Sequence, residues 1–206
     1  RLSRGYVRGL WRYLGSDIDV PAPDVYTTPE IMAIMREEYE LLSKKTDPGV
    51  ITGKPLRAGG SEVRSYSTAQ GGVYCVRALA QKMNWVPAST TVAIQGFGNA
   101  GSVMATLLSK EGYCIVAASD SKGGVFQPKG LDIQKLEAHK EKTGSVVGFE
   151  DSQAMSNEEL LLADVDILVP AALENVITQE NASSVRAKAI VELANGPTTP
   201  EADAIL

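Results

Sequence analysis

The six-residue segment Gly96-Phe97-Gly98-Asn99-Ala100-Gly101 constrains the fold of this chain more than any other. The apolar run Thr91–Gln95 before it predicts a strand, and the residues after it predict a helix. A G-x-G-x-x-G turn in that context is typical of a dinucleotide-binding unit, because its glycines permit a tight turn, approach of a pyrophosphate and close helix packing. We expect all six residues to line a cofactor site, with free N–H groups at the helix start holding the phosphates.

An acidic residue ends the next predicted strand, Cys114–Ser119. Asp120 stands 24 positions after Gly96 and is expected to accept hydrogen bonds from the adenine ribose hydroxyls. Its charge favours NAD, because a carboxylate repels the 2′-phosphate of NADP. Ser121 and Lys122 could instead bind that phosphate, so the cofactor is NAD or NADP.

Strands and helices alternate from Thr90 onward. Two further strands are expected at 166–170 and 189–193, helices are expected at 100–111, 132–143, 157–162 and 178–186, and Gly123-Gly124 indicates a loop. Apolar strands without period-two alternation, separated by helices, predict a parallel sheet covered on both faces. The predicted fold class is therefore α/β, with a Rossmann-like, doubly wound, mostly parallel sheet.

The first third of the chain has a different pattern. Helices are expected over 2–14 and from Thr28-Pro29 to about residue 47, followed by a glycine-rich loop at 49–61. We place a domain boundary near residue 66, with 1–65 as a short helical remnant of another domain and 66–206 as the dinucleotide-binding domain. The chain starts at Arg1 and ends in a predicted helix, so we expect a piece of a longer protein.

Charge and composition argue against several classes of partner. The net charge is −5 and the basic residues are scattered, which argues against a nucleic-acid surface. No apolar run approaches the roughly 18 residues of a membrane span, so no membrane partner is expected. His139 is the single histidine and Cys75 and Cys114 are the two cysteines, too few ligands for a metal site. We interpret both cysteines as small buried hydrophobes in a reducing, cytoplasmic compartment.

Longer motifs distributed over essentially all 206 residues carry a family resemblance. They are Asp19–Thr27, Thr52–Leu56, Gln95–Asn99, Ser119–Gly124, Pro170–Asn175 and Ala194–Pro200. On these motifs the chain resembles the glutamate/leucine/phenylalanine/valine dehydrogenase family, and most closely its glutamate dehydrogenases. The resemblance implies reversible, NAD(P)-dependent oxidative deamination of glutamate to 2-oxoglutarate and ammonia, with hydride transfer to nicotinamide. It also implies a homo-oligomer, a hexamer for full-length members and a smaller assembly for this chain.

The same resemblance assigns two residues of the first 65 to the substrate side. Asp24 matches an aspartate that moves protons beside a catalytic lysine, a task that suits a carboxylate in a cleft. Arg64 matches an arginine on the substrate side of the cleft. Without the family, the residues themselves favour a turn aspartate between Pro23 and Val25.

Further residues are assigned to the cofactor by resemblance. Thr68 matches a threonine that bonds the nicotinamide amide, and Asn195 matches an asparagine beside the nicotinamide ribose. Ala171 and Ala172 are assigned to the cofactor site through the motif that contains them. Considered alone, Thr68 and Asn195 are each better explained by a cap or loop hydrogen bond, and the surrounding motif favours the functional assignment.

The sequence also departs from the family pattern around the nicotinamide half of the site. Val63, Ala69 and Leu193 stand where the family has glycine, and Ser67 stands where it has alanine. The family's catalytic lysines would precede this chain, and a substrate-binding serine would follow it. Two alternatives therefore stay open: a catalytically silent NAD(P)-binding module, and a leucine, valine or phenylalanine dehydrogenase.

Overall fold

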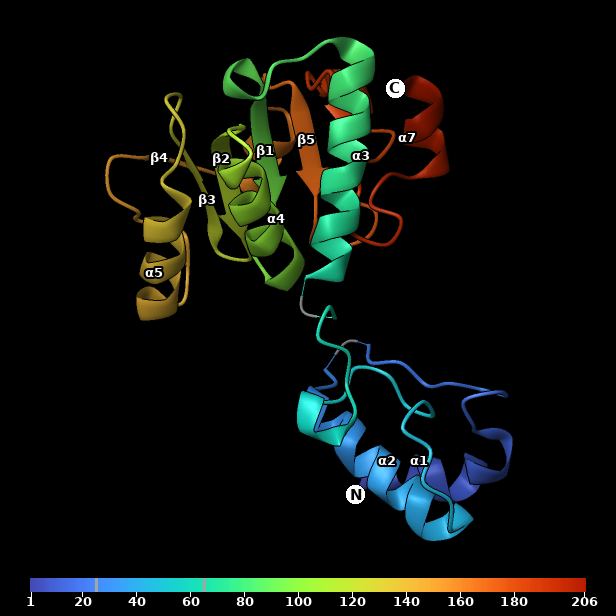
Figure 1. Cartoon of the computed structure of the whole chain (residues 1–206). Helices are drawn as coiled ribbons and strands as arrows, with labels where there is room; N and C mark the ends of the chain where they lie inside the picture. The colour runs from blue at the N-terminus through green and yellow to red at the C-terminus, as the bar shows by residue number, and fades with distance from the viewer. Residues whose placement is uncertain (25, 65) are drawn as a thin grey trace. The chain divides into compact units, whose positions relative to one another are not determined.

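The computed structural model describes residues 1–24, 26–64 and 66–206. The chain divides into two compact units, Arg1–Ser65 and Tyr66–Leu206 (Figure 1). Val25, part of the motif Asp19–Thr27, and Ser65, where the predicted first domain ends, lie outside the described residues.

Helices α1 (Leu2–Leu10) and α2 (Pro29–Ser43) form the first unit together with its loops. Thr28 caps α2 as its sequence predicts, because the Thr28 hydroxyl accepts a bond from the N–H of Ile31 at 3.3 Å. The buried apolar side chains of this unit form one cluster: Val7, Leu14, Met32, Met35, Tyr39, Val50 and Ile51. The unit therefore has a small core of its own.

A six-stranded sheet forms the second unit, in the order β4-β3-β2-β1-β5-β6. The strands in chain order are β1 (Thr91–Gln95), β2 (Cys114–Asp120), β3 (Gly123–Phe126), β4 (Gln153–Met155), β5 (Ile167–Pro170) and β6 (Ala189–Ile190). The pairings of β2 with β1, β1 with β5 and β5 with β6 are parallel, and those of β3 are antiparallel. The predicted Rossmann-like, mostly parallel sheet is confirmed.

Helices cover both faces of this sheet. One core cluster joins it to α3 (Ser67–Met83), α4 (Asn99–Lys110) and α5 (Ile133–Thr143) (Figure 1). The other joins it to α6 (Asn157–Leu161) and α7 (Pro200–Ile205). Val92 and Ile94 belong to the first cluster and Ala93 belongs to the second, because successive side chains of a strand point to opposite faces.

The hairpin of β3 and β4 corrects the prediction of a loop at Gly123-Gly124. Gly124 pairs with Ser119 of β2 and with Met155 of β4. Two glycines in a four-residue strand hide it from propensity, because glycine is depleted in strands. Pairing with the longer neighbouring strand β2 supplies what the local sequence lacks.

The helix predicted over 178–186 is also wrong, since only Ala182–Ser184 forms a 3₁₀ turn there. The Asn181 side chain accepts a bond from the N–H of Thr178 and donates one to the carbonyl of Val176, both at 2.9 Å. Such local side-chain bonds compete with a regular helix.

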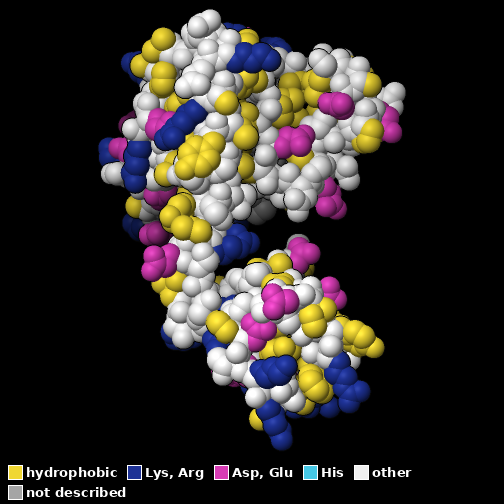
Figure 2. All heavy atoms as spheres, turned by 45° about the vertical axis from the view of Figure 1, so that its right-hand side comes forward, with side chains coloured by type: hydrophobic (Ala, Val, Ile, Leu, Met, Phe, Trp, Pro, Cys, Tyr) yellow, Lys and Arg dark blue, Asp and Glu magenta, His cyan; other side chains and the backbone are white. Residues whose placement is uncertain are grey.

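The distribution of charge and exposed residues can be compared with what the sequence predicted about binding partners. On the face shown in Figure 2, acidic and basic side chains are interspersed. No helix in the described part of the chain has both the length and the apolar character required to cross a bilayer. Cys75 is exposed, contrary to the expectation of two buried cysteines, and Cys114 is partly buried.

Candidate functional site

The carboxyl ends of the parallel strands meet at one edge of the sheet. From β1 the chain continues through α4 to β2 on one side, while β5 lies on the other side of β1. A ligand of an open α/β sheet binds outside the carboxyl ends of its strands at such a switch point. The N–H of Ala171, directly after β5, donates to the carbonyl of Gln95 at 2.7 Å, which joins the two strand ends there.

The glycine turn, defined as Gly96–Gly101, leads from β1 into α4. Gly96 has φ +100°, and a Cβ on it would lie 2.7 Å from the Cβ of Ala172. A Cβ on Gly101 would lie 1.9 Å from the Gly96 carbonyl oxygen. The turn and the segment Ala171-Ala172 therefore pack against each other without room for further side-chain atoms.

Gly98, in contrast, faces open space, since a Cβ there would meet no atom within 4 Å. It is the N-cap of α4 and has no side-chain capping bond. The first bond of the helical ladder runs from the N–H of Ser102 to the carbonyl of Gly98 at 2.9 Å, so the amides before Ser102 can bind an anion. An uncapped helix start beside open space fits a diphosphate.

The other residues of the turn differ in what they can present. Asn99 is exposed and Ala100 is partly buried. The Phe97 side chain is only 2 % exposed and belongs to the core. The N–H of Phe97 donates to the carbonyl of Ser119 and its carbonyl accepts from Lys140, so Phe97 shapes the turn and does not offer its ring or its N–H to a cofactor, which narrows the expectation drawn from the sequence.

Asn195 lies at the same edge of the sheet. The N–H groups of Leu193 and Ala194 both donate to the carbonyl of Pro170, the last residue of β5, at 2.9 and 3.1 Å. Asn195 follows directly and is exposed. This places it beside the end of β5, with Ala171 next in the chain after Pro170.

Thr68 is the second residue of α3 and is exposed. One turn later, a Cβ on Gly72 would lie 2.7 Å from Cδ2 of Leu193. The first turns of α3 therefore approach the segment that carries Asn195. Leu193, which departs from the family pattern, fills the space directly beside Gly72.

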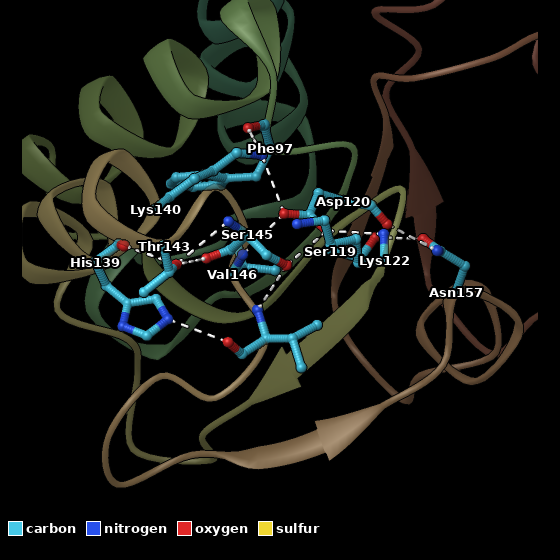
Figure 3. Close-up of polar contacts among 11 residues, drawn as sticks. Phe97, Ser119, Asp120, Lys122, His139, Lys140, Thr143, Ser145, Val146 and Asn157 are labelled. Carbon is cyan, nitrogen blue, oxygen red and sulfur yellow. Dashed lines mark hydrogen bonds and ion pairs between the residues drawn. The ribbon is translucent and has the colours of Figure 1, made fainter.

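Asp120 is engaged by the protein itself (Figure 3). Its Oδ1 accepts bonds from the N–H of Lys122 at 2.9 Å and the Ser145 hydroxyl at 3.1 Å. Its Oδ2 accepts one from the N–H of Val146 at 2.8 Å and lies 3.2 Å from Nζ of Lys140. The side chain is 9 % exposed, so this conformation does not offer the carboxylate to a ribose as the sequence predicted.

The pKa of Asp120 reflects these contacts. Burial favours the neutral acid, but hydrogen bonds from the backbone of Lys122 and Val146, together with Lys140, outweigh it and hold the pKa below its usual value. Lys140 was not predicted from the sequence. It lies in a charged helical stretch that is typical of a solvated face, and no spacing rule links it to the glycine turn.

Ser121 and Lys122 are exposed at the turn between β2 and β3. They line a hollow of about 510 Å³, together with residues of β4 and the first turn of α6. The hollow begins one residue beyond Asp120, at the turn that follows β2.

Asp24 and Arg64 belong to the first unit. Asp24 is exposed, its N–H donates to Oγ1 of Thr27 at 2.7 Å, and Oγ1 of Thr27 donates to the carbonyl of Asp24 at 2.6 Å. Arg64 is exposed, and its N–H donates to the carbonyl of Ser61 at 3.3 Å.

Comparison with known families accounts for most of the chain. Residues 59–206 match the family described as glutamate/leucine/phenylalanine/valine dehydrogenase. Residues 1–41 match the family described as the Glu/Leu/Phe/Val dehydrogenase dimerisation domain. The resemblance found in the sequence motifs is confirmed.

Curated relatives include an NADP-specific glutamate dehydrogenase of Synechocystis, 46 % identical over 215 residues. A cryptic catabolic NAD-specific glutamate dehydrogenase of Bacillus subtilis is 48 % identical over 207 residues. Both alignments include 100 % of this chain but only 50 % and 48 % of the relatives. The chain thus spans about half the length of the curated relatives it matches.

Solved structures agree. A hetero-hexameric glutamate dehydrogenase of Thermus thermophilus superposes with a TM-score of 0.90 at 33 % identity, over 98 % of this chain and 48 % of that one. A glutamate dehydrogenase of Peptoniphilus asaccharolyticus superposes with a TM-score of 0.80 at 38 % identity, over 100 % and 48 %. The chain belongs to the glutamate/leucine/phenylalanine/valine dehydrogenase family.

Proposed function

We propose that this protein is an NAD(P)-dependent glutamate dehydrogenase that interconverts glutamate with 2-oxoglutarate and ammonia, and that this chain supplies its dinucleotide-binding part. The observation that carries the proposal is the glycine turn, an uncapped helix start with open space at Gly98. The names of the relatives support glutamate as the substrate and either NAD or NADP as the cofactor.

Within this proposal, the amides of residues 98–101 in the glycine turn bind the cofactor diphosphate, and Asn99 bonds the bound cofactor from the same turn. When bound there, the cofactor would supply the acceptor for the hydride that leaves the α-carbon of the amino acid. Thr68 orients the nicotinamide amide, and Asn195 lies beside the nicotinamide ribose. Ala171 and Ala172 limit the space opposite Gly96.

The first unit, residues 1–65, would be the remnant of the substrate domain, with the boundary near residue 66. Asp24 would hold and move a proton for the reacting amino group, and Arg64 would bind the substrate carboxylate. The free state of both cysteines is compatible with a reducing, cytoplasmic setting.

A homo-oligomer is part of the proposal, with a hexamer for the full-length protein and a smaller assembly for this chain. One face of α1 exposes apolar side chains at helical spacing, with Leu2 88 %, Tyr6 45 % and Leu10 38 % exposed. Contact with a second copy would bury them. Sedimentation of the wild-type chain and of a Leu2→Lys/Tyr6→Lys variant tests this, and a monomeric wild type would contradict it.

The direct test is titration of the chain with NADH and NADPH, followed by nicotinamide fluorescence and by the melting temperature, which a ligand of the native state must raise. Glutamate, leucine, valine and phenylalanine are then assayed with the full-length protein through reduced-nicotinamide absorbance. We expect binding, and turnover that prefers glutamate. Cofactor binding without turnover would favour the catalytically silent NAD(P)-binding module. Turnover that prefers leucine would favour a leucine dehydrogenase. Absence of cofactor binding would refute the proposed site.

A further inference from the structure

Lys140 connects α5 to the glycine turn (Figure 3). Its Nζ donates to the carbonyl of Phe97 at 2.7 Å and lies 3.2 Å from Oδ2 of Asp120. The same ammonium lies 5.8 Å from the centroid of the Phe97 ring. With 28 % of its side chain exposed, Lys140 is a partly buried cation that contacts two of the residues assigned to the cofactor site.

The Asp120 carboxylate completes this contact. An ionised carboxylate offers about four acceptor positions, and Asp120 already meets Lys122, Ser145, Val146 and Lys140. A ribose hydroxyl would have to displace one of these donors. The carboxylate therefore serves the protein interior, where it neutralises Lys140 and fixes its position.

We propose that Asp120 and Lys140 act as positioning residues for the cofactor: Asp120 holds the Lys140 ammonium on the Phe97 carbonyl, and this bond orients and polarises the Phe97–Gly98 peptide. The N–H of that peptide belongs to Gly98, the N-cap of α4. A hydrogen bond accepted by a peptide carbonyl strengthens the same peptide's N–H as a donor, and a charged donor has the larger effect. The inference rests on the proposed function, because the polarised N–H is assigned to the cofactor diphosphate.

The bond from Lys140 to the Phe97 carbonyl links the glycine turn to a distant part of the chain. Lys140 follows Phe97 by 43 positions and approaches it from α5. The N–H groups of Gly96 and Phe97 both donate to the carbonyl of Ser119, which ties the turn to β2. Lys140 adds a bond from α5, so Phe97 is held through its N–H by β2 and through its carbonyl by Lys140.

Three variants separate positioning from direct ligand binding: Lys140→Met, Asp120→Asn and the double variant. Lys135→Met is the matched control, because Lys135 lies on the same helix, is 78 % exposed and pairs only at 3.4 Å with Asp132. Dissociation constants for NADH and NADPH are measured by calorimetry. Lys140→Met is expected to weaken both cofactors alike, by about tenfold, whereas Lys135→Met leaves both unchanged.

The double variant gives the decisive comparison. If Asp120 acts through Lys140, Asp120→Asn weakens binding in the wild-type background but adds little in the Lys140→Met background, since neighbouring residues in one network are not additive. A full additional loss in that background would mean that Asp120 contacts the cofactor itself and would overturn the proposal. Loss of NADPH affinity alone in Lys140→Met would also overturn it, because Lys140 would then bind the 2′-phosphate directly.

A spectroscopic measurement needs no cofactor. The amide ¹H–¹⁵N resonance of Gly98 should shift in Lys140→Met and in Asp120→Asn, and stay in place in Lys135→Met. Lys140→Arg, which keeps the charge and a donor, should restore most of the shift and of the affinity. An unmoved Gly98 resonance in a folded chain that binds cofactor normally would refute the positioning role alone, whereas a chain that binds neither NADH nor NADPH would refute the proposed function.

Discussion

The carbonyl oxygen of Gly96 lies 1.9 Å from the point where a Cβ of Gly101 would stand. The start of α4 thus rests directly on the backbone that leaves β1. The same Cβ would also lie 3.3 Å from Cγ2 of Ile94, so the neighbouring core leaves little room for adjustment. Two of the three glycines in the turn are required by packing, and the third, Gly98, is not.

Gly101→Ala is therefore expected to destabilise the second unit by about 1–3 kcal/mol, because a methyl group there forces the backbone to move. Urea unfolding followed by circular dichroism measures the change. Gly71→Ala on α3 is the control, since a Cβ there meets nothing within 4 Å and alanine favours a helix by about 0.5–1 kcal/mol. Equal stability of Gly101→Ala and wild type would contradict the close packing.

Gly98→Ala should have the opposite profile, with normal folding and impaired binding. A Cβ at Gly98 meets no protein atom, so the melting temperature is expected to stay near that of wild type. The methyl group would occupy the space assigned to the diphosphate and weaken NADH and NADPH by about tenfold or more. Calorimetry measures the two affinities. Unchanged affinity in Gly98→Ala would show that the diphosphate does not bind at this turn.

The first unit depends on one buried carboxylate. Glu38 is 2 % exposed and lies 2.7 Å from Arg4 and 2.6 Å from Arg8 of α1. Hydrogen bonds from these two arginines hold the pKa of Glu38 below its usual value. Glu38→Gln is expected to lower the free energy of unfolding of this unit, because it removes the charge that both arginines contact. Glu37→Gln is the control, since Glu37 is 67 % exposed, and an equal loss in both variants would contradict a specific role of Glu38.

The alternating strands and helices could be predicted from the sequence because the residues that signal each element lie within or beside that element. Thr28 indicates the start of α2, and the apolar run before Gly96 indicates β1, each within a few residues. β3 escaped prediction because Gly123 and Gly124 carry no strand signal and their pairing partner on β2 supplies the stability. Elements formed by tertiary pairing do not show in local propensity.

The candidate site likewise has a part that could be predicted from the sequence and a part that could not. The glycine turn was visible because its constraint lies within six residues. The Asp120 contacts were not visible, since Lys140 lies on α5 and Ser145 follows that helix, 20 and 25 positions further along the chain. The motif assigns Asp120 to the adenine ribose, but the motif carries no information about the protein donors that already surround the carboxylate.

Asp166 makes the stability of the second unit depend on pH in acid. Oδ2 of Asp166 accepts bonds from the N–H and the hydroxyl of Thr91 at 2.7 and 2.9 Å, and Oδ1 lies 2.7 Å from Nζ of Lys188. Burial, which alone would raise the pKa, is outweighed by the bonds from Lys188 and Thr91, so the pKa of Asp166 is lowered on folding. The resulting stabilisation is complete above the unfolded pKa of about 3.9 and is lost as the pH falls through the lower folded value.

Asp166→Asn should accordingly be less stable than wild type by about 1–3 kcal/mol at neutral pH, with the difference shrinking below about pH 4. Urea unfolding at a series of pH values measures both free energies. Asp203→Asn on α7, where the side chain is exposed, is the control and should follow wild type throughout. A difference between Asp166→Asn and wild type that stayed constant from neutral to acid pH would assign the stabilisation to the shape of the side chain, because ionisation can contribute only where the carboxylate is charged.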